Sequence, residues 1–358
     1  MPPGIPFIIG NEVAERFSFY GMKAILAVFM FKYLHLMGEA PGVAMSEEAA
    51  TERVHLFNGW VYLTPFIGAL LADIFFGKYR IIIWLSLVYC MGHAALALMG
   101  VTGEAKAWLF AGLALIALGS GGIKPCVSAH VGDQFGASNS RLLSRVFNYF
   151  YFSINLGSFV STLLTPWVLE WFGPHWAFGI PGVLMAIATF TFWLGRNRFI
   201  HVPPGGRRFV AELADRKGWT GLLRLLPIYL FVAMFWALFD QTGSKWIFQA
   251  QDMDRHFLGV EWLESQFQAA NPILVLTLIP LFTFFLYPAI SKFFPLSPLR
   301  KISIGLFLMA ATFAVISVVQ MAIDSGQRPN IGWQLLAYVL LTASEVMVSI
   351  VALEFAYT

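Results

Sequence analysis

Residues 5–33 read IPFIIGNEVAERFSFYGMKAILAVFMFKY, an apolar run of membrane-spanning length that contains Glu12, Glu15, Arg16 and Lys23. An ionised side chain at the centre of a bilayer costs about 2.5–3.5 kcal/mol on insertion scales. Several of them on one helix cannot face lipid, so we expect them to point into a protein-lined, hydrated interior and to find partners on other helices. Ionisable groups in such places usually mark a pathway or a binding site. The segment therefore indicates a transporter.

The composition is that of a polytopic membrane protein. Of the 358 residues, 58% are hydrophobic and 12% are charged, whereas a soluble domain carries roughly 25% charged residues. No basic region precedes the first apolar segment, which carries acids in its middle, so we expect no cleavable signal peptide. Cys90 and Cys126 lie in apolar runs without a CxxC pattern or spaced histidines. This predicts two buried thiols and no metal site.

Apolar runs long enough to cross about 30 Å of hydrocarbon predict about ten helices. Their ranges are 5–36, 53–76, 80–101, 106–130, 143–170, 175–195, 221–250, 271–293, 300–323 and 331–357. The connections contain helix breakers or polar clusters, as at 203–206 and 324–327. The predicted fold class is therefore an all-α polytopic membrane protein.

Basic residues in the connections alternate with the crossings, as the positive-inside rule describes. One side holds Lys78, Arg80, Arg141, Arg145, Arg196, Arg198, Arg207, Arg208, Arg216, Lys217, Arg224, Lys292, Arg300 and Lys301. The other side holds only Arg53, Lys106, Arg255 and Arg328, together with the acidic residues Glu39, Glu47, Glu48, Glu52, Asp252, Asp254, Glu261 and Glu264. This distribution predicts a cytoplasmic N-terminus.

A basic linker divides the chain into two parts. Residues 1–196 form a predicted bundle of six helices, 197–220 the cytoplasmic linker, and 221–358 a predicted bundle of four. The two parts are weakly alike, because each joins its second and third helices by a basic loop. Repeated halves with a binding site at their interface are the plan of the major facilitator transporters.

Beyond the first helix, the predicted membrane interior contains Lys124, Asp240, Lys245, Glu345 and Glu354. Ion pairs that merely lock helices together are one interpretation, but buried ion pairs stabilise poorly compared with apolar packing. A cavity with both signs suits a zwitterion, whose carboxylate meets Arg or Lys and whose ammonium meets Glu. The protein carboxylates that line such a cavity can also carry protons. Burial raises the proton affinity of a carboxylate, and a nearby cation lowers it again. The residues predict a charged or zwitterionic solute and proton coupling.

The segment Glu12-Val13-Ala14-Glu15-Arg16-Phe17, continued by Tyr20-Gly21, resembles the ExxERF…YG signature of the proton-dependent oligopeptide transporters, the peptide and nitrate branch of the major facilitator superfamily. Agreement continues in order along the chain at 68–73 with 77–80, 119–125, 132–135, 150–158, 235–241, and from 345 through 353–357. The resemblance implies the major facilitator fold, with a six-helix N-terminal bundle and four helices of an incomplete C-terminal bundle. It is closest to bacterial di- and tripeptide symporters.

The resemblance implies roles in proton coupling and gating. Glu12, Glu15 and Arg16 would form a proton-responsive cluster whose partner is Lys124. Lys23 would pair with Asp240 to close the outer gate. Asp73 and Arg80 would act in gating or stabilise their loop.

It also implies a peptide site. Lys23 and Lys124, with Arg16, would hold the peptide carboxylate, and Glu345 would receive the ammonium. Asn155 and Asn271 would hydrogen-bond the peptide backbone, while Tyr20, Tyr62 and Trp236 would line side-chain pockets. Plain packing is the alternative for Tyr62 and Trp236. Asn271 precedes Pro272 and could simply begin a helix.

Two features depart from the family pattern. Family members have twelve core helices, and many bacterial ones carry two more in the central linker. Here the linker at 203–220 is too short for an insertion, and the sequence stops at Thr358, at the end of the tenth predicted helix. We therefore expect the eleventh and twelfth helices to be absent from this sequence.

The expected function is proton-coupled symport of di- and tripeptides by alternating access in the bacterial cytoplasmic (inner) membrane, with protons as the coupling ion and no cofactor, metal or nucleic acid. One alternative is a transporter of nitrate or another small anion, which needs less of an ammonium site at Glu345. Another is a receptor or scaffold that binds without turnover. An enzyme is disfavoured, because no Ser/His/Asp set, paired aspartates or metal spacing stands out. Peptide preference, proton stoichiometry, oligomeric state and the role of Lys245 stay open.

Overall fold

The computed structural model describes residues 1–38, 42–136, 139–213 and 216–357, and it describes their side chains except at 140, 144, 211–218, 220–222, 224 and 350–357. The predictions that involve Glu39, Arg216, Lys217, Arg224 and Glu354 lie outside the residues whose side chains are described. The chain forms two compact units, Met1–Trp219 and Thr220–Thr358. Each unit is described by itself.

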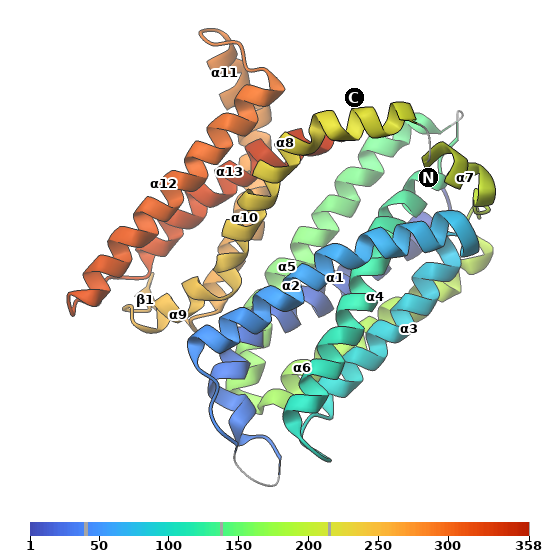
Figure 1. Ribbon diagram of the computed structural model, residues 1–358. Coiled ribbons are helices and arrows are strands. Elements are labelled where there is room, and N and C mark those ends of the chain that lie inside the picture. Colours follow the sequence, from blue (N-terminus) through green and yellow to red (C-terminus); the bar gives the residue numbers. More distant parts are fainter. Residues whose placement is uncertain (39–41, 137–138, 214–215, 358) are drawn as a thin grey trace. The chain divides into compact units, whose positions relative to one another are not determined.

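The unit Met1–Trp219 is a helical bundle (Figure 1). Its helices are α1 (Ile5–Val28), which continues through a π-helical turn at Phe29–Tyr33, α2 (Glu47–Leu71), which continues through another at Ala72–Phe76, α3 (Lys78–Ala97), α4 (Ala105–Asp133), α5 (Leu143–Phe172), α6 (Pro174–Leu194) and α7 (Gly206–Leu213). Within the bundle, α1 packs against α5 and α6, while α3 packs against α4 and α6, and α2 packs against α4. Helices that are distant in sequence therefore pack together, and α6 contacts both α1 and α3.

The unit Thr220–Thr358 is also mainly helical. Its elements are α8 (Arg216–Phe239, which begins just before the unit), α9 (Lys245–Gln251), the antiparallel strands β1 (His256–Phe257) and β2 (Val260–Glu261), α10 (Ala270–Leu281), α11 (Tyr287–Ser291), α12 (Pro298–Asp324) and α13 (Gly332–Tyr357). The helix α13 packs against both α10 and α12. The core contains the buried Trp246 ring, whose centroid lies 5.0 Å from that of Tyr338 and 6.2 Å from that of Phe313.

The described residues contain nine helical segments long and apolar enough to cross a membrane, each overlapping one predicted range, and α13 coincides with the tenth. The range 221–250 differs from the prediction, because α8 ends at Phe239 and a 3-10 turn, Asp240–Gly243, separates it from α9. Two local causes act there. The Thr242 hydroxyl donates to the Phe239 carbonyl (2.9 Å), which competes with the helical pattern, and glycine disfavours a helix interior.

Local sequence explains where several helices begin. Ser46 caps α2, because its hydroxyl accepts a hydrogen bond from the amide of Ala49 (3.2 Å), and acidic residues fill the first turn. Ser297 caps α12 in the same way, with Pro298 in the first helical position. These caps satisfy amides that would otherwise lack partners at the start of a helix.

Small residues set the close approach of α4 to its neighbours. A Cβ atom at Gly68 of α2 would lie 2.6 Å from the Cα of Gly122, and one at Gly119 would lie 2.7 Å from the Cβ of Tyr89 on α3. Only glycine leaves room for such backbone contact between membrane helices. The glycines of 119–122 therefore position α4 tightly between α2 and α3.

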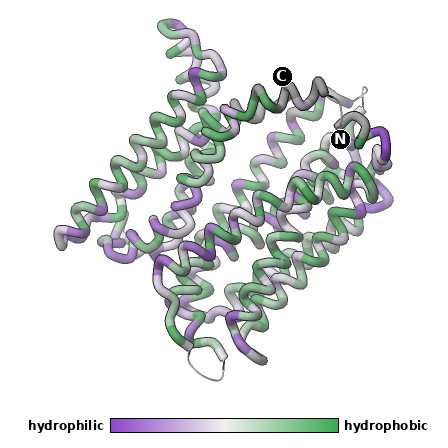
Figure 2. Tube along the Cα trace, viewed as in Figure 1, coloured by the Kyte–Doolittle hydropathy of each residue, from purple (hydrophilic) through white to green (hydrophobic). Residues whose placement is uncertain are grey.

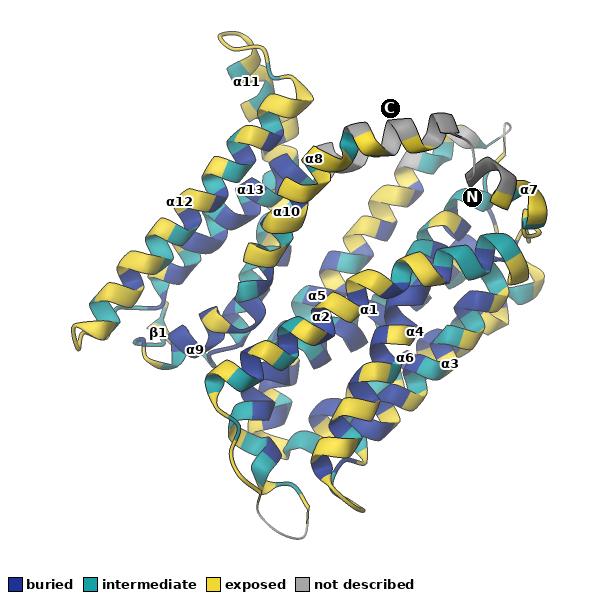
Figure 3. Ribbon diagram, viewed as in Figure 1, coloured by how far each residue is buried: buried dark blue, intermediate teal, exposed yellow. Residues whose placement is uncertain are grey.

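The outer faces of the helices are apolar. In Figure 2 the hydrophobic colour follows the long helices, and the hydrophilic colour gathers mainly in their connections. Figure 3 shows many exposed positions along the same helices. On α12, Phe307 is 78% exposed and Met321 is 62% exposed. Exposed apolar side chains at this density are what helices in contact with lipid tails require.

Candidate functional site

The cluster predicted on α1 is present. Arg16 Nε donates to Glu12 Oε1 across one helical turn (2.6 Å) and lies 3.3 Å from Glu15 Oε2. All three side chains are buried in the unit Met1–Trp219. Residues four apart share a helix face, so Glu12 and Arg16 pair directly while Glu15 points to an adjoining face. One guanidinium thus serves two buried carboxylates.

Lys124 of α4 approaches this cluster through Phe19. Its ammonium nitrogen lies 3.7 Å from the centroid of the Phe19 ring, one turn beyond Arg16, in a cation–π contact. Lys124 also interacts electrostatically with Glu12 and Glu15. Within the described residues it makes no ion pair, so the Lys124 charge is near both acids but directly bonded to neither.

The other basic and aromatic residues predicted on α1 lie beside this group. Lys23 and Tyr20 are half-buried on α1, and the Tyr20 ring packs edge-on against Phe19, with 5.4 Å between centroids. Lys23 belongs to the unit Met1–Trp219 and Asp240, which is buried, to the unit Thr220–Thr358. Their pairing as an outer gate stays a prediction.

In the second unit, the predicted residues Asn271 and Glu345 are bonded to each other. The Asn271 amide donates to Glu345 Oε2 (2.7 Å) and to Thr342 Oγ1 (3.1 Å), so it joins α10 to α13. Asn271 lies in the first turn of α10, as the helix-start interpretation expected, but its side chain is turned to α13. Thr342 was not predicted. Its position three residues before Glu345, on the same helix face, is the signal that could have indicated it.

The remaining substrate candidates are more scattered. Asn155 is buried, and its amide donates to the Tyr151 carbonyl of its own helix (2.9 Å). Tyr62 is 54% exposed on α2. Trp236 is half-buried in α8, where its ring packs against Phe239 with 5.1 Å between centroids. Asn155 and Tyr62 belong to one unit and Trp236 to the other, and a pocket that they share stays a prediction.

Lys245, whose role the sequence left open, is the exposed first residue of α9. The seventh predicted span is interrupted just before it by the 3-10 turn Asp240–Gly243.

The predicted inner-gate residues lie at one end of α2 and α3. The Asp73 backbone carbonyl accepts a hydrogen bond from the Gly205 amide (2.7 Å), and Arg80 is exposed. The ion pair there joins two residues that were not predicted: Lys78 Nζ lies 2.9 Å and 3.0 Å from the two carboxylate oxygens of Asp133. Both belong to segments that carried the family resemblance, so they could have been proposed as partners. This pair ties the start of α3 to the end of α4.

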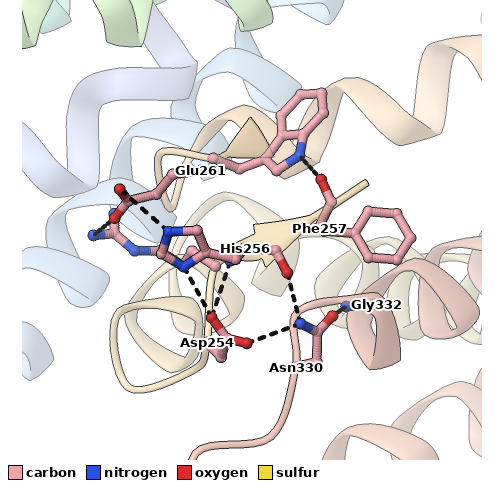
Figure 4. A network of polar contacts seen from close by, with 8 residues as sticks. Asp254, His256, Phe257, Glu261, Asn330 and Gly332 are labelled. Carbon is pink, nitrogen blue, oxygen red and sulfur yellow. Dashed lines mark hydrogen bonds and ion pairs between the residues drawn. The ribbon is translucent and has the colours of Figure 1, made fainter. Parts of the chain in front are cut away.

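A polar network outside the membrane spans ties the β1–β2 hairpin to the loop before α13 (Figure 4). The Asn330 amide donates to Asp254 Oδ2 (3.1 Å) and to the His256 carbonyl (2.7 Å), and His256 Nδ1 lies 3.2 Å from Asp254 Oδ1. Hydrogen bonds from the His256 backbone amide, the Asn330 amide and the His256 ring hold the pKa of Asp254 below its ordinary value. Arg255 pairs with Glu264 (2.8 Å) beside the network.

Among the described residues, no three His, Cys, Asp or Glu side chains gather as a metal site would require. Cys126 is a buried free thiol, as predicted. Cys90 is also a free thiol but only half-buried, so the prediction of a buried thiol is wrong there; its Sγ lies 3.6 Å from Thr189 Oγ1.

Comparison with known proteins gives the family. The POT family model matches residues 79–216 and 209–358. The chain belongs to the POT family. This confirms the resemblance carried by Glu12–Phe17 and the later segments, and it makes the chain a multi-pass membrane protein whose relatives are transporters rather than enzymes.

Individual POT proteins are similar along nearly all of this chain. Human solute carrier family 15 member 2 is 38% identical over 402 residues, covering 99% of this chain and 54% of that protein. Peptide transporter family 1 of Drosophila melanogaster is 38% identical over 368 residues, covering 90% and 48%. The chain thus spans about half the length of the curated relatives it matches.

A solved POT structure confirms the fold. The crystal structure of the POT family transporter PepTSo superimposes with a TM-score of 0.90 at 38% identity, covering 100% of this chain and 84% of that one. The expected major facilitator fold is therefore correct for this POT chain.

Proposed function

We propose that this POT chain takes part in proton-coupled symport of short peptides by alternating access. The observation that carries the proposal is the arrangement of Glu12, Glu15 and Arg16 on α1 with Lys124 beside them. The human relative is named a solute carrier and the Drosophila relative a peptide transporter, and both names support transport of a small organic solute. The whole protein's activity is inferred from these features together.

The α1 cluster is suited to bind and release a proton. Arg16 hydrogen-bonds Glu12, whereas the Glu15 oxygens accept no hydrogen bond among the described residues and have only the 3.3 Å ion-pair contact. Protonation of Glu15 therefore breaks no hydrogen bond, while the Arg16–Glu12 pair persists. Loss of one negative charge weakens the attraction on Lys124, whose ammonium is then able to bind a substrate carboxylate. Proton uptake and carboxylate binding would be coupled in this way.

A short peptide carries a carboxylate at one end and an ammonium at the other, and each of the two units of the chain contains groups of the opposite charge. In one unit, Lys124 and Lys23 with Arg16 supply the basic groups for its carboxylate. In the other, Glu345 is held in place by Asn271 and supplies the acid for its ammonium. Asn155 would orient the peptide bond, and Tyr20, Tyr62 and Trp236 would accept side chains. Aromatic walls tolerate varied side chains because they offer area rather than directional bonds.

Gating completes the transport cycle. Lys23 and Asp240 would form the outer gate, because each is a charge in a membrane segment and the two have opposite sign. Asp73 and Arg80 would act at the opposite end, where the Lys78–Asp133 ion pair already joins α3 and α4. The positive-inside distribution supports a cytoplasmic N-terminus and a cytoplasmic location for this end. The resemblance of the sequence motifs to those of bacterial di- and tripeptide symporters is what supports a bacterial inner membrane.

Uptake into proteoliposomes tests the proposal. The full protein is reconstituted, an inward proton gradient is imposed, and accumulation of a labelled dipeptide is measured. We expect Glu15→Gln and Lys124→Ala to abolish gradient-driven accumulation. Glu104→Gln, an exposed acid just before α4, serves as the control and should leave uptake unchanged. If both site variants accumulate peptide like the unmodified protein, the coupling assignment is wrong.

The same preparation separates the alternatives. A transporter of nitrate or another small anion needs no ammonium site, so Glu345→Gln would leave its uptake intact, whereas peptide uptake should fall. A receptor or scaffold would bind peptide saturably but accumulate none. If vesicles that hold a proton gradient bind peptide saturably but accumulate none, the symport proposal is wrong and the receptor or scaffold function is supported.

A further inference from the structure

Near the face of α1 that carries Glu15, several further side chains are polar and buried. Within the described residues, the side-chain oxygen and nitrogen of Asn11, both oxygens of Glu15, the Tyr89 hydroxyl and both ring nitrogens of His93 have no hydrogen-bond partner. All four side chains are 2% exposed or less. Buried polar atoms are nearly always paired with protein or with ordered water. A group of them in one region therefore calls for a shared partner.

The helix geometry places these groups around one region of the unit Met1–Trp219. Asn11, Glu15 and Ser18 follow one another at spacings of four and three, so they share a face of α1. Ser18 Oγ donates to the Pro181 carbonyl (2.6 Å), which sets that face against α6. Glu15 therefore lies on the face of α1 that is turned to α6, while its Oε2 stays 3.3 Å from Arg16 Nε.

Two residues of α3, Tyr89 and His93, border the same region. Tyr89 and His93 are one turn apart, and their rings stack with 4.9 Å between centroids. Tyr89 packs on Gly119 of α4, and His93 packs on Gly182 of α6, where an added Cβ would lie 3.0 Å from the His93 Cβ. The Tyr89 hydroxyl interacts electrostatically with Glu15. The stacked pair thus lies between α4 and α6 and within reach of the charge on α1.

A hydroxyl from α4 completes the surroundings. Ser120 is fully buried, and its Oγ also lacks a partner in the described residues. It lies one turn before Lys124, whose ammonium contacts Phe19 of α1, so Ser120 lies on the face of α4 that is turned to α1. The polar groups of α1 and α3 therefore lie on helices that both pack against α6, and Ser120 adds a buried hydroxyl of α4 that has no partner among the described residues.

We propose that Asn11, Glu15, Tyr89 and His93 hold an internal water site that hydrates Glu15. Buried waters make about three hydrogen bonds to groups that otherwise lack partners, and these side chains supply both donors and acceptors. Tyr89 and His93 are positioning residues in this site, since they act on Glu15 through water and contact no solute. The site deepens the proposed function, because bound water gives Glu15 a route for proton exchange that Arg16 does not provide.

Hydroxyl-radical footprinting tests for the water directly and does not depend on transport. Radiolysis of bound internal water oxidises the side chains that contact it, even when they are buried. In the full protein we expect oxidation of Tyr89 and His93 severalfold faster than that of Phe178, which is equally buried in the same unit but packs on the ring of Phe29. Oxidation of Tyr89 at the rate of Phe178 would overturn the water site.

Transport assays then test what the site does. Tyr89→Phe removes only the hydroxyl, and we expect proton-driven uptake to fall about tenfold, the upper end of the effect of losing one neutral hydrogen bond, here to the bound water. Counterflow exchange, which needs binding and gating but no net proton movement, should be unchanged. Ser18→Ala is the matched control, because that hydroxyl already has protein acceptors.

The outcomes separate the water site from the proposed function. An equal loss of uptake and counterflow in Tyr89→Phe would mean a merely structural role and would overturn the positioning role. Absence of gradient-driven uptake in the unmodified protein would contradict the proposed symport, whereas the footprinting result would stand on its own.

Discussion

The amide of Asn271 on α10 donates a 2.7 Å hydrogen bond to the carboxylate of Glu345 on α13 and a second bond to Thr342. A carboxylate held in this way keeps one orientation before a substrate arrives, so less entropy is lost on binding. The proposed ammonium site of the POT chain is therefore preorganised by a residue from a different helix.

Truncation of that amide should weaken peptide binding. Asn271→Ala leaves the half-buried Glu345 carboxylate without this donor, and hydrogen bonds to charged groups are worth about 1.5–3 kcal/mol. We expect the KM for a dipeptide to rise about tenfold, with a smaller change in the maximal rate. Concentration-dependent uptake measures both. Thr277→Ala, on the same helix but bonded only to its own backbone, is the control; an equal effect in both variants would refute the specific role of Asn271.

Replacement of Arg16 by lysine should not be conservative. The guanidinium spans Glu12 and Glu15 with a planar set of donors, which an ammonium cannot reproduce. We expect Arg16→Lys to retain the fold but to lose most gradient-driven uptake. Arg16→Ala leaves two buried acids without a counter-charge and should destabilise the protein by about 3–5 kcal/mol. Thermal unfolding in detergent and uptake in vesicles measure the two effects, and normal uptake by the lysine variant would contradict the first.

Two glycines of α2 should respond oppositely to the same change. A Cβ at Gly68 would collide with the backbone of Gly122, whereas one at Gly59 meets nothing within 4 Å. Gly59→Ala should stabilise the helix by about 1 kcal/mol through propensity alone. Gly68→Ala should destabilise by about 1–3 kcal/mol, because the packed helices must move apart. Melting temperatures of the two variants report the signs, and a rise in both would show that the α2–α4 contact is looser than the structure has it.

The hairpin network should loosen in acid. The folded pKa of Asp254 lies below its unfolded value, so its contribution to stability is present above that unfolded pKa and is lost as the pH falls through the folded pKa. We expect hydrogen exchange of the amides at 254–262, corrected for intrinsic rates, to quicken as the pH falls below about 4. Asp254→Asn removes the titrating group, so its exchange should lack this step. The same acid-induced step in the asparagine variant would assign it to another group.

The chemistry of α1 is readable from sequence because it is local. The residues Glu12, Glu15 and Arg16 lie within two turns of one helix, and helical periodicity alone places Arg16 beside Glu12. The charges on later spans are readable for a related reason: ionised groups in an apolar run need an interior partner. Hydropathy likewise located the nine membrane-length segments found among the described residues, since the bilayer demands long helices wherever the chain crosses it.

Partner choice between distant helices was decided by the tertiary structure. How the helices cross and rotate decides four of the contacts described above. They are the hydrogen bond from Asn271 to Glu345, the ion pair of Lys78 with Asp133, the cation–π contact of Lys124 with Phe19, and the stacking of Tyr89 on His93. A sequence records which face of a helix is polar, but the rotation that brings two faces together follows from packing along the whole contact. For this reason the place of His93 in the proposed water site could be inferred only from its neighbours Tyr89 and Gly182, which the sequence does not reveal.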